Sequence, residues 1–538
     1  MKSYLNIFAR RSAAITPQAQ PIPGTVPNAA GGHAFPVDDW TRLDRFLILG
    51  SEGGSYYASE RTLTRDNAQA VLRAIASDGV RAVARIVEVS EGGRAPKNEP
   101  ALFALALAAS AADLATRQAA LAALPRVART GTQLFQFAGF AQGTRGWGRA
   151  LRRAVGAWYL AQPVERLAYQ LVKYRQRGGW SHRDLLRLAH PETAEPARVA
   201  LLDFVCRGTE SEALPALVQA AAALGRSADG ATAAALIRAH DLPREAVPTG
   251  LLNDPAVWEA LLERMPLTAL VRSLAKLTAV GVVRPLGERL PLVLSALGDA
   301  DRIARARLHP LAILLALRTY AQGRGDRGGL QWEPVQPVID ALNAAFYTAF
   351  KVVEPTGKRL LLALDVSGSM AGGRVAGTSL TPREASAAMA LMTAATEANT
   401  HIVGFTAAAG QGQWSRQAEL TRLSLSPSMR LDDAVRAVSS LPFGGTDCAL
   451  PMLYALERRI PVDAFVVYTD SETWAGSIHP VQALRHYRER TGIAAKLVVV
   501  GLVSNGFSIA DPNDAGMLDV VGFDTASPAV IADFIRQG

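Results

Sequence analysis

The sequence predicts a multidomain chain in which an all-α domain of stacked helix pairs is followed by a doubly wound α/β domain. Between about Asp39 and Phe350, Ala, Leu and Arg recur at helical spacing, and convincing β-type runs are lacking. After Pro355, short apolar runs alternate with helical stretches, which is typical of a parallel sheet with helices on both faces. The length of 538 residues also exceeds what one hydrophobic core usually supports.

Short connections separate the helices that are predicted for the first domain. Examples of helical spacing are Asn67 to Ala76, Pro100 to Ala120, Val199 to Cys206, Ala213 to Leu224 and Leu308 to Tyr320. A long series of such helices indicates an α-solenoid of antiparallel pairs, although the sequence shows no strict repeat period.

The second domain is predicted from its strands and helices. We expect strands at Arg359 to Leu364, His401 to Phe405, Ala464 to Tyr468 and Lys496 to Val503, and helices at Pro382 to Ala398, Leu431 to Leu441, Ala449 to Arg459 and Pro480 to Arg490. The first 35 residues are rich in Pro, Gly, Ala and Gln, which predicts a flexible or extended arm. The chain is therefore divided into an arm (1–35), an α-helical domain (36–355) and an α/β domain (356–538).

A triplet of oxygen-bearing side chains follows the first predicted strand of the α/β domain. Leu361 to Leu364 is an apolar run that ends in Asp365-x-Ser367-x-Ser369. Ligands bind at the carboxyl ends of strands in open α/β sheets, so one carboxylate and two hydroxyls are expected to converge there. Such oxygen donors suit a hard divalent cation, for which Mg²⁺ is the prime candidate.

Two further oxygen donors are available elsewhere in the α/β domain. Thr446 lies in the Gly-rich loop that starts at Leu441, and Asp470 ends the apolar run that starts at Ala464. The alternative is a solvated, Ser-rich turn that binds nothing. The combined pattern resembles the metal-ion-dependent adhesion site of von Willebrand factor A domains. This resemblance implies one ligand set, acting directly or through water: Asp365, Ser367, Ser369, Thr446 and Asp470.

Composition points to an ordinary globular protein in a reducing compartment. Hydrophobic residues make up 49% of the chain and charged residues 20%. Its two cysteines, Cys206 and Cys448, are too few for a disulfide framework and lack metal-ligand spacing. The start of the chain lacks the apolar core of a secretory signal, and Asp113 interrupts the longest apolar run. We therefore expect a cytoplasmic protein without a membrane partner.

Positive charge is concentrated outside the α/β domain. The net charge is +9, of which +12 lies before Arg359 and −3 from Arg359 onward. A basic amino-terminal body is typical of a protein with a polyanionic partner, and nucleic acid is favoured over membrane. The alternative is a solubilising surface in an Arg-rich composition, and charge alone does not separate the two.

One segment combines basic and aromatic residues. Helical spacing places Arg166, Gln170, Lys173 and Arg177 on one face, with Leu167, Leu171 and Tyr174 on a neighbouring inward face. Gly178-Gly179 is expected to end this helix, and Ser181 with Asp184 resembles the capping box of a second helix that carries Arg183, Arg187 and His190.

Two interpretations fit this predicted pair of antiparallel helices. Their cationic strip could bind single-stranded RNA through phosphates and stacked bases. The alternative is solvated arginines around a core Trp180, with His190 capping its helix before Pro191. Spacing alone slightly favours this alternative.

Longer motifs resemble the Ro autoantigen family with its TROVE module. They are Phe46-x-x-x-Gly-Ser-Glu-Gly-Gly-Ser-Tyr-Tyr57, Trp147-Gly-Arg-Ala-Leu-Arg152, the stretch from Lys173 to His190, Arg307-x-His-Pro310 and Gly323 to Trp332. The resemblance spans nearly the whole chain after residue 35, and the motifs occur in the family's order.

The resemblance implies a ring of HEAT-like helical repeats that is closed by the von Willebrand factor A-like domain. It implies that single-stranded 3′ ends of misfolded non-coding RNAs bind in the hole of the ring and that Y RNA binds a basic outer face. The family's RNA-contacting residues fall on Lys173, Arg177 and His190. For a bacterial member, the resemblance also implies that Y RNA links the protein to a 3′ exoribonuclease such as polynucleotide phosphorylase during rRNA maturation, RNA decay and stress.

The leading hypothesis is therefore a non-enzymatic, monomeric RNA-binding ring with six RNA-binding residues: Lys173, Arg177, His190, Arg166, Arg183 and Arg187. A second hypothesis is a metal-dependent protein–protein interaction scaffold, in which a partner's carboxylate completes the metal site. A nuclease or phosphatase is disfavoured because the metal site is poor in carboxylates and lacks a cluster for a second metal. His401 and His479 are expected to be surface or packing residues.

Overall fold

The computed structural model describes residues 16–51, 59–306, 308–325, 329–349, 354–375, 378–407, 418–423, 425–426, 429–439, 444–523 and 527–537. Parts of three motifs that carry the family resemblance lie outside the described residues: residues 52–57, residue 307 and residues 326–328.

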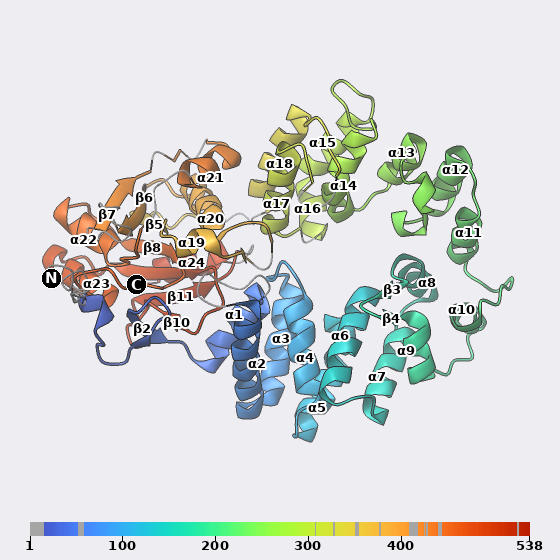
Figure 1. Cartoon of the computed structure of the whole chain (residues 1–538), viewed down its shortest axis with the longest axis horizontal. Coiled ribbons are helices and arrows are strands. Elements are labelled where there is room, and N and C mark those ends of the chain that lie inside the picture. Colours follow the sequence, from blue (N-terminus) through green and yellow to red (C-terminus); the bar gives the residue numbers. More distant parts are fainter. Residues whose placement is uncertain are drawn as a thin grey trace, which may run out of the picture.

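The first domain is an arc of helices that leaves the α/β domain on one side and returns to it on the other (Figure 1). Helices α1–α9 form the lower side of the arc in this view, and α14–α18 form its upper side. The bounds are α1 (Asp39–Leu49), α2 (Glu60–Ser77), α3 (Gly79–Gly92), α4 (Glu99–Ala109), α5 (Leu114–Val127), α6 (Gly131–Thr144), α7 (Arg149–Leu160), α8 (Val164–Lys173), α9 (His182–Ala189), α10 (Pro196–Arg207), α11 (Ala216–Gly225), α12 (Gly230–His240), α13 (Pro255–Glu263), α14 (Leu267–Ala279), α15 (Leu290–Gly298), α16 (Ala300–Ala306), α17 (Pro310–Ala321) and α18 (Gln336–Ala349). The predicted helical domain is confirmed.

One predicted helix, Pro100 to Ala120, is wrong because two helices occupy its place. Helix α4 ends at Ala109, and α5 starts at Leu114. Asp113 accepts a hydrogen bond from Thr116 N at 2.7 Å and so caps α5. A cap in this position satisfies an unpaired backbone donor of a new helix, and the chain can therefore change direction there.

The α/β domain contains a sheet of order β11-β9-β8-β5-β6-β7, in which only the edge strand β7 runs antiparallel. Its strands are β5 (Leu360–Asp365), β6 (Thr400–Ala407), β7 (Ala418–Arg422), β8 (Ala464–Thr469), β9 (Lys496–Gly501) and β11 (Met517–Val521), and its helices are α19 (Ser369–Gly372), α20 (Pro382–Thr396), α21 (Leu431–Ser439), α22 (Leu450–Glu457), α23 (Pro480–Thr491) and α24 (Ser527–Arg536). The doubly wound fold is confirmed, but β7 and β11 were not predicted.

Strand β5 lies in the centre of this sheet and is buried along its whole length. Its side chains alternate between two cores. Leu362 and Leu364 pack on the side of α20 and α21, whereas Leu361 and Ala363 pack with residues of α22 and α23. Burial on both faces explains why this strand reads as a continuous apolar run.

The described part of the predicted arm, residues 16–36, is an extended segment packed on the α/β domain. Strand β2 (His33–Pro36) lies between β1 (Val26–Pro27) and β10 (Phe507–Ser508), both antiparallel to it. Gln18 is fully buried and donates from Nε2 to Asp447 Oδ1 at 2.7 Å. These contacts hold the described arm in place, so it is not free in solution.

The α/β domain contacts both ends of the helical arc and thereby closes a ring (Figure 1). At one end, Arg45 of α1 donates to both carboxylate oxygens of Asp519 of β11, at 2.8 and 2.7 Å. At the other end, Arg318 of α17 pairs with Glu384 of α20 at 3.1 Å. The Arg45 side chain is only 1% exposed, so the first ion pair belongs to the buried part of the joint.

Candidate metal site and basic surface

The predicted metal-binding triplet follows the buried end of β5. Asp365 is fully buried, and its Oδ1 accepts a hydrogen bond from Ser367 N at 2.9 Å. This bond turns the chain directly after the strand and brings Ser367 Oγ within 3.1 Å of Ser369 Oγ. The carboxylate and the two hydroxyls therefore gather on one turn, as the sequence predicts.

The two distal residues of the predicted ligand set also lie at this edge of the sheet. The Thr446 loop meets the triplet where Gly368 N donates to the carbonyl of Gly444 at 3.4 Å. Asp470 follows β8, the parallel neighbour of β5, and burial and the charge of Asp365 raise its pKa to about 7. Thr446 and Asp470 are both buried.

Electrostatics at this site favour a bound cation. Burial raises the pKa of Asp365, although hydrogen bonds from Ser367 and Thr469 oppose this effect. Two buried carboxylates repel each other when both are ionised, and this repulsion destabilises the folded protein unless a positive charge offsets it. Arg383 of α20 is buried nearby and donates to the carbonyl of Ser367 at 3.1 Å. Two carboxylates and three hydroxyls are hard donors, so the residues present fit Mg²⁺.

Sequence reasoning missed Glu472, which lies two residues after Asp470. Glu472 is 3% exposed, and burial and the charge of Asp470 raise its pKa to about 8. Ala30 N of the arm donates to its Oε2 at 2.9 Å. A second acidic residue is visible in the sequence between Thr469 and Thr473. Its burial could not be predicted from the neighbouring residues, because the arm covers it.

Within the described part of the chain, no three His, Cys, Asp or Glu side chains gather into a metal-binding group. The candidate site therefore depends on hydroxyls as much as on carboxylates. His479 is buried with Nε2 3.0 Å from the carbonyl of Gln20, and His401 lies beside Tyr454. Both histidines pack, as expected.

The predicted helix through Arg177 is wrong in its last turn. Helix α8 ends at Lys173, and Gln176–Arg177 (β3) pairs antiparallel with Trp180–Ser181 (β4). Gly178 and Gly179 have φ values of 58° and 82°. Two successive residues with positive φ form the tight turn of a β-hairpin, and glycine adopts this conformation without strain.

The predicted single cationic face of α8 is also wrong. Gln170 is 6% exposed, and its Oε1 accepts a hydrogen bond from Gly131 N at 2.9 Å. Lys173 is half-buried, and its Nζ lies 3.1 Å from Tyr169 Oη and 5.5 Å from the ring centroid of Tyr174. Leu167 and Leu171 are buried, as predicted.

Helix α9 carries exposed positive charge. The capping box of Ser181 and Asp184 is present, which confirms the predicted helix start. Arg183 and Arg187 are exposed one turn apart, and both lower the pKa of the Cys206 thiol, which burial raises. His190 is exposed with φ 45°, and its N–H donates to Leu186 O at 2.9 Å, so it ends α9.

Lys173 faces a different part of the helical arc from Arg183 and Arg187. It lines a cavity of about 420 Å³ together with residues of α12 and α13, including Arg238 and Glu263. Arg166 is exposed on α8, and Arg177 is exposed on the hairpin. The six predicted RNA-binding residues are thus distributed over α8, the hairpin and α9 rather than along one strip.

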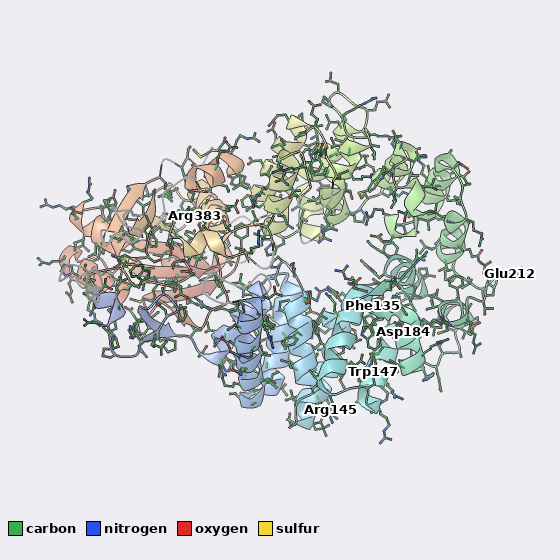
Figure 2. All side chains as sticks on the ribbon, viewed as in Figure 1. Phe135, Arg145, Trp147, Asp184, Glu212 and Arg383 are labelled. Atoms are coloured by element: carbon green, nitrogen blue, oxygen red, sulfur yellow. The ribbon has the colours of Figure 1, made fainter. Side chains whose placement is uncertain are left out.

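Trp180 of the hairpin packs against Trp147, with ring centroids 5.4 Å apart. Both side chains are half-buried and contact the main core of the helical domain. Figure 2 places Trp147 and Asp184 in the helical arc and Arg383 in the α/β domain on the other side of the chain. The basic segment and the candidate metal site are therefore separate sites.

Both domains match known family models. The TROVE domain model matches residues 26–216 and 239–319, and the Ro60 vWA domain model matches residues 359–535. The first of these matches includes part of the segment predicted as an arm. No helix among the described residues is both long and apolar enough to cross a membrane.

Two curated relatives match almost the full chain. The RNA-binding protein RO60 of Deinococcus radiodurans is 45% identical over 519 residues, which cover 95% of each chain. The RNA-binding protein RO60 of Caenorhabditis elegans is 38% identical and covers 95% of this chain and 90% of its own length. The crystal structure of the Deinococcus radiodurans RO (RSR) protein superimposes with a TM-score of 0.69 at 43% identity, covering 93% of this chain and 99% of that one. The chain therefore belongs to the Ro60 family, as a bacterial-type member with a TROVE domain and a von Willebrand factor A-like domain.

Proposed function

We propose that this protein is a non-enzymatic RNA-binding ring. It binds Y RNA on its basic surface and the single-stranded 3′ ends of misfolded or immature non-coding RNAs. The observation that carries the proposal is the nearly full-length similarity to two proteins named as RNA-binding. The surplus of positive charge in the helical domain and the exposed Arg177, Arg183, Arg187 and His190 support it.

The proposal places the protein in the cytoplasm as a monomeric ring. There it delivers RNA to a 3′ exoribonuclease such as polynucleotide phosphorylase during rRNA maturation, RNA decay and stress survival. Phosphate neutralisation by Lys and Arg dominates such binding, so affinity falls steeply as salt rises.

Filter binding with a Y-RNA-like hairpin tests the RNA surface. Lys173→Ala/Arg177→Ala should lower affinity by roughly tenfold or more, because each lost cation removes a charge-assisted hydrogen bond. The slope of log affinity against log salt should become shallower by about 1.4 to 1.8 for two lost phosphate contacts. The matched control is Arg61→Ala/Arg65→Ala, which removes two exposed cations from α2. Equal affinity and slope in the Lys173/Arg177 variant would remove this surface from the proposal.

We also propose that Asp365, Ser367, Ser369, Thr446 and Asp470 hold Mg²⁺, directly or through water. The ion would supply positive charge to the buried carboxylates and a coordination position for one outside ligand. Mg²⁺ at a hundred times its Kd should stabilise the parent protein by about 2.7 kcal/mol. Asp365→Asn should abolish this stabilisation in a thermal unfolding series with Mg²⁺, and an equal Mg²⁺ effect in the variant would refute the site.

A second candidate function is metal-dependent binding of a protein partner through the same site. The observation that favours it is the position of the triplet at the carboxyl edge of the sheet, where α/β domains bind ligands. A partner's Asp or Glu would then complete the coordination of the ion. Pull-downs with the parent and with Asp365→Ala test this function, and identical sets of captured proteins would count against it.

A further inference from the structure

The described part of the arm, residues 16–36, forms hydrogen bonds to both loops that carry the distal residues of the candidate metal site. The side chain of Gln18 is fully buried. Its Nε2 donates to Asp447 Oδ1 and to the carbonyl of Ile478, both at 2.7 Å. Its Oε1 accepts hydrogen bonds from Thr473 Oγ1 at 2.6 Å and from Gly476 N at 3.0 Å. One amide group of the arm therefore uses both its nitrogen and its oxygen to hold two segments of the α/β domain together.

These contacts lie beside the predicted metal ligands. Asp447 follows Thr446 in the chain, and Thr473 lies three residues after Asp470. The carbonyl of Thr446 accepts a hydrogen bond from Trp474 N at 3.0 Å, which joins the two loops directly. The arm closes the same junction from outside the ligand set.

A second part of the arm, the turn from Asn28 to Gly32, contacts one of these loops. Asn28 Oδ1 accepts a hydrogen bond from Gly32 N at 2.7 Å, which closes the turn. Asn28 Nδ2 donates to the carbonyl of Thr473 at 2.7 Å, and Ala30 N donates to Glu472 Oε2 at 2.9 Å. Gly32 lies so close to the loop that a Cβ atom at this position would be 1.8 Å from Thr473 O. The close approach of the arm to this loop therefore requires glycine at position 32.

The geometry that Mg²⁺ needs gives these contacts a consequence. Mg²⁺ demands nearly octahedral coordination with short distances to its oxygen ligands, so the ligands must be held closely in place. Asp365, Ser367 and Ser369 lie on one turn that forms its own hydrogen bonds. Thr446 and Asp470 lie on separate loops, whose relative position depends on the contacts between these loops and the arm. Loss of a residue that orients metal ligands typically lowers metal affinity by about 10- to 100-fold.

We propose that Gln18 and the turn from Asn28 to Gly32 are positioning residues of the metal site, and that docking of the arm and binding of Mg²⁺ favour each other. This inference rests on the proposed Mg²⁺ site and goes beyond it, because it assigns a role to a segment outside the predicted ligand set. By linkage, the docked arm raises Mg²⁺ affinity by the same factor by which Mg²⁺ favours docking of the arm. The arm acts through the two loops and needs no contact with the ion.

Calorimetric titration of the full chain with Mg²⁺ tests the positioning role. Gln18→Met keeps the length of the side chain but removes its four hydrogen bonds, so it should lower Mg²⁺ affinity by about 10- to 100-fold. Gly32→Ala leaves Gln18 and every predicted ligand unchanged, but its Cβ forces the arm away from Thr473, so it should also lower the affinity. Titration well below the unfolding midpoint of each variant separates this effect from a loss of folding.

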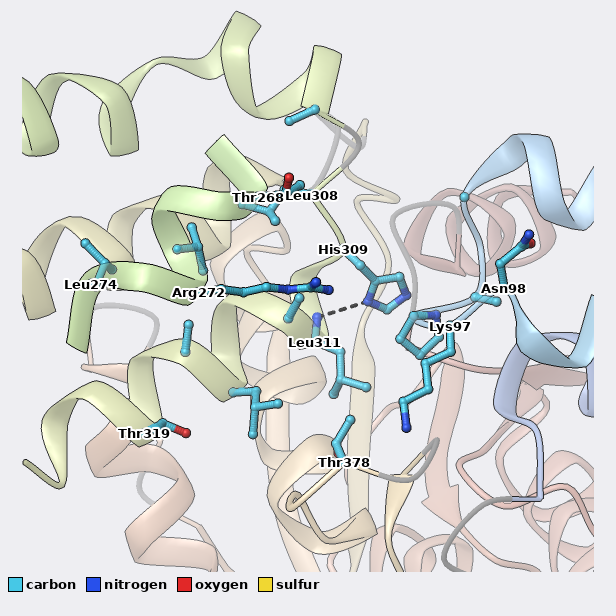
Figure 3. Close-up of a pocket in the computed structure, with 18 of the residues that line it drawn as sticks. Lys97, Asn98, Thr268, Arg272, Leu274, Leu308, His309, Leu311, Thr319 and Thr378 are labelled. Atoms are coloured by element: carbon cyan, nitrogen blue, oxygen red, sulfur yellow. Dashed lines mark hydrogen bonds between the residues drawn. The ribbon is translucent and has the colours of Figure 1, made fainter. Parts of the chain in front are cut away.

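Two controls separate positioning from general destabilisation. Thr25→Ala removes the hydrogen bonds that Thr25 Oγ1 forms with the backbone of Ile22 within the arm. His309→Ala removes a hydrogen bond in the helical domain, which His309 Nδ1 accepts from Leu311 N at 3.1 Å (Figure 3). These bonds do not involve the loops of the metal site, so both variants should bind Mg²⁺ with the affinity of the parent protein.

The arm itself provides a reciprocal readout of the coupling. Saturating Mg²⁺ should slow hydrogen exchange in peptides that cover residues 16–36 of the parent protein, including the Ala30 amide that donates to Glu472. Asp365→Asn removes a predicted ligand, so Mg²⁺ should leave exchange in its arm unchanged.

Three results would overturn the proposal while leaving the metal site in place. The first is equal Mg²⁺ affinity in the parent, Gln18→Met and Gly32→Ala, and the second is an equal loss of affinity in the two controls. The third is arm exchange in the parent that bound Mg²⁺ does not change. If Mg²⁺ does not bind the parent protein at all, the proposed metal site fails and this inference fails with it.

Discussion

Burial of His182 should make the helical domain sensitive to mild acid. His182 is 2% exposed, its Nδ1 lies 2.7 Å from Tyr159 Oη, and its ring lies 4.6 Å from that of Phe135. Burial lowers its pKa from 6.5 to about 3, although backbone groups of Gln170 and Tyr174 oppose this effect. The imidazole therefore stays neutral in the folded protein at any pH that cells maintain.

The two pKa values determine in which direction stability changes with pH. Between pH 6.5 and 3, the unfolded chain binds a proton that folded His182 does not bind, so stability is full above pH 6.5 and falls as the pH falls. At pH 5 the loss is about 2 kcal/mol for a folded pKa near 3 and an unfolded pKa near 6.5.

His182→Phe removes the titrating group and keeps an aromatic ring in the site. The variant loses the contact with Tyr159 at every pH, so the informative quantity is the change between pH 7.5 and pH 5. That change should be about 2 kcal/mol smaller than in the parent. Hydrogen exchange of the amides in α7 and α9, corrected for the intrinsic effect of pH, measures it.

His190→Asn is the control, because it replaces an exposed histidine at a left-handed position that asparagine tolerates. It should keep the pH dependence of the parent. The same loss of protection between pH 7.5 and 5 in His182→Phe and in the parent would refute the assignment of this acid sensitivity to His182.

Three further predictions concern the closure of the ring, the hairpin and the arm. Asp519→Ala leaves the buried Arg45 without its carboxylate, although Arg45 keeps its hydrogen bonds to Asn505 and to the carbonyl of Phe507, and it should lower the free energy of unfolding by about 3 to 5 kcal/mol. Asp39→Ala breaks an exposed pair and should cost no more than about 1 kcal/mol, so equal losses would refute the role of burial. Gly179→Ala places a side chain at a left-handed backbone position and should destabilise the hairpin by about 1 to 2 kcal/mol, measured by amide exchange, with a smaller effect for Gly179→Asn. An alanine variant as stable as the parent would contradict the turn geometry. Gln18→Ala removes a hydrogen bond to the buried Asp447 and should lower the free energy of unfolding by about 1 to 3 kcal/mol. An unchanged midpoint of thermal unfolding would show that this contact of the arm does not contribute to stability.

The strands that the sequence predicted are those that are buried on both faces. Residues 360–365 and 464–469 form continuous apolar runs because helices cover both sides of the sheet, and this burial leaves a local signal. Strand β11 lacks this signal, because Asp519 interrupts it to pair with Arg45 of α1. Its polar residue serves a contact with a helix far away in the sequence.

The end of α8 shows how a real local signal can be overlooked. The predicted helix extended to Arg177 because Arg177 lies four residues after Lys173, which is helical spacing. Two glycines between Gln176–Arg177 and Trp180–Ser181 are also the signature of a tight hairpin, and this turn decides the structure. Helical spacing describes which residues could share a face, but it does not show where the helix ends.

Some features of the candidate metal site follow from local sequence, and others depend on contacts with distant parts of the chain. Asp365 and Asp470 could be placed together because each ends a buried parallel strand, and parallel strands end at the same edge. The burial of Glu472 could not be predicted, since Ala30 N, more than four hundred residues earlier in the chain, donates the hydrogen bond to its carboxylate. A contact of this kind leaves no periodicity in either segment.

The arm therefore belongs to the folded unit that carries the metal site. Gln18 binds Asp447, the neighbour of Thr446, and Ala30 binds Glu472, close to Asp470, so both loops that supply distal ligands are held by residues 16–36. Burial raises the pKa of Asp447 to about 6, and the hydrogen bond from Gln18 counteracts this rise. Without the arm, each of these buried acceptors would lose a donor, at a cost of about 1 to 3 kcal/mol. The same segment continues into α1, whose Arg45 pairs with β11. Order in the metal loops and closure of the ring are thus connected through one short stretch of chain.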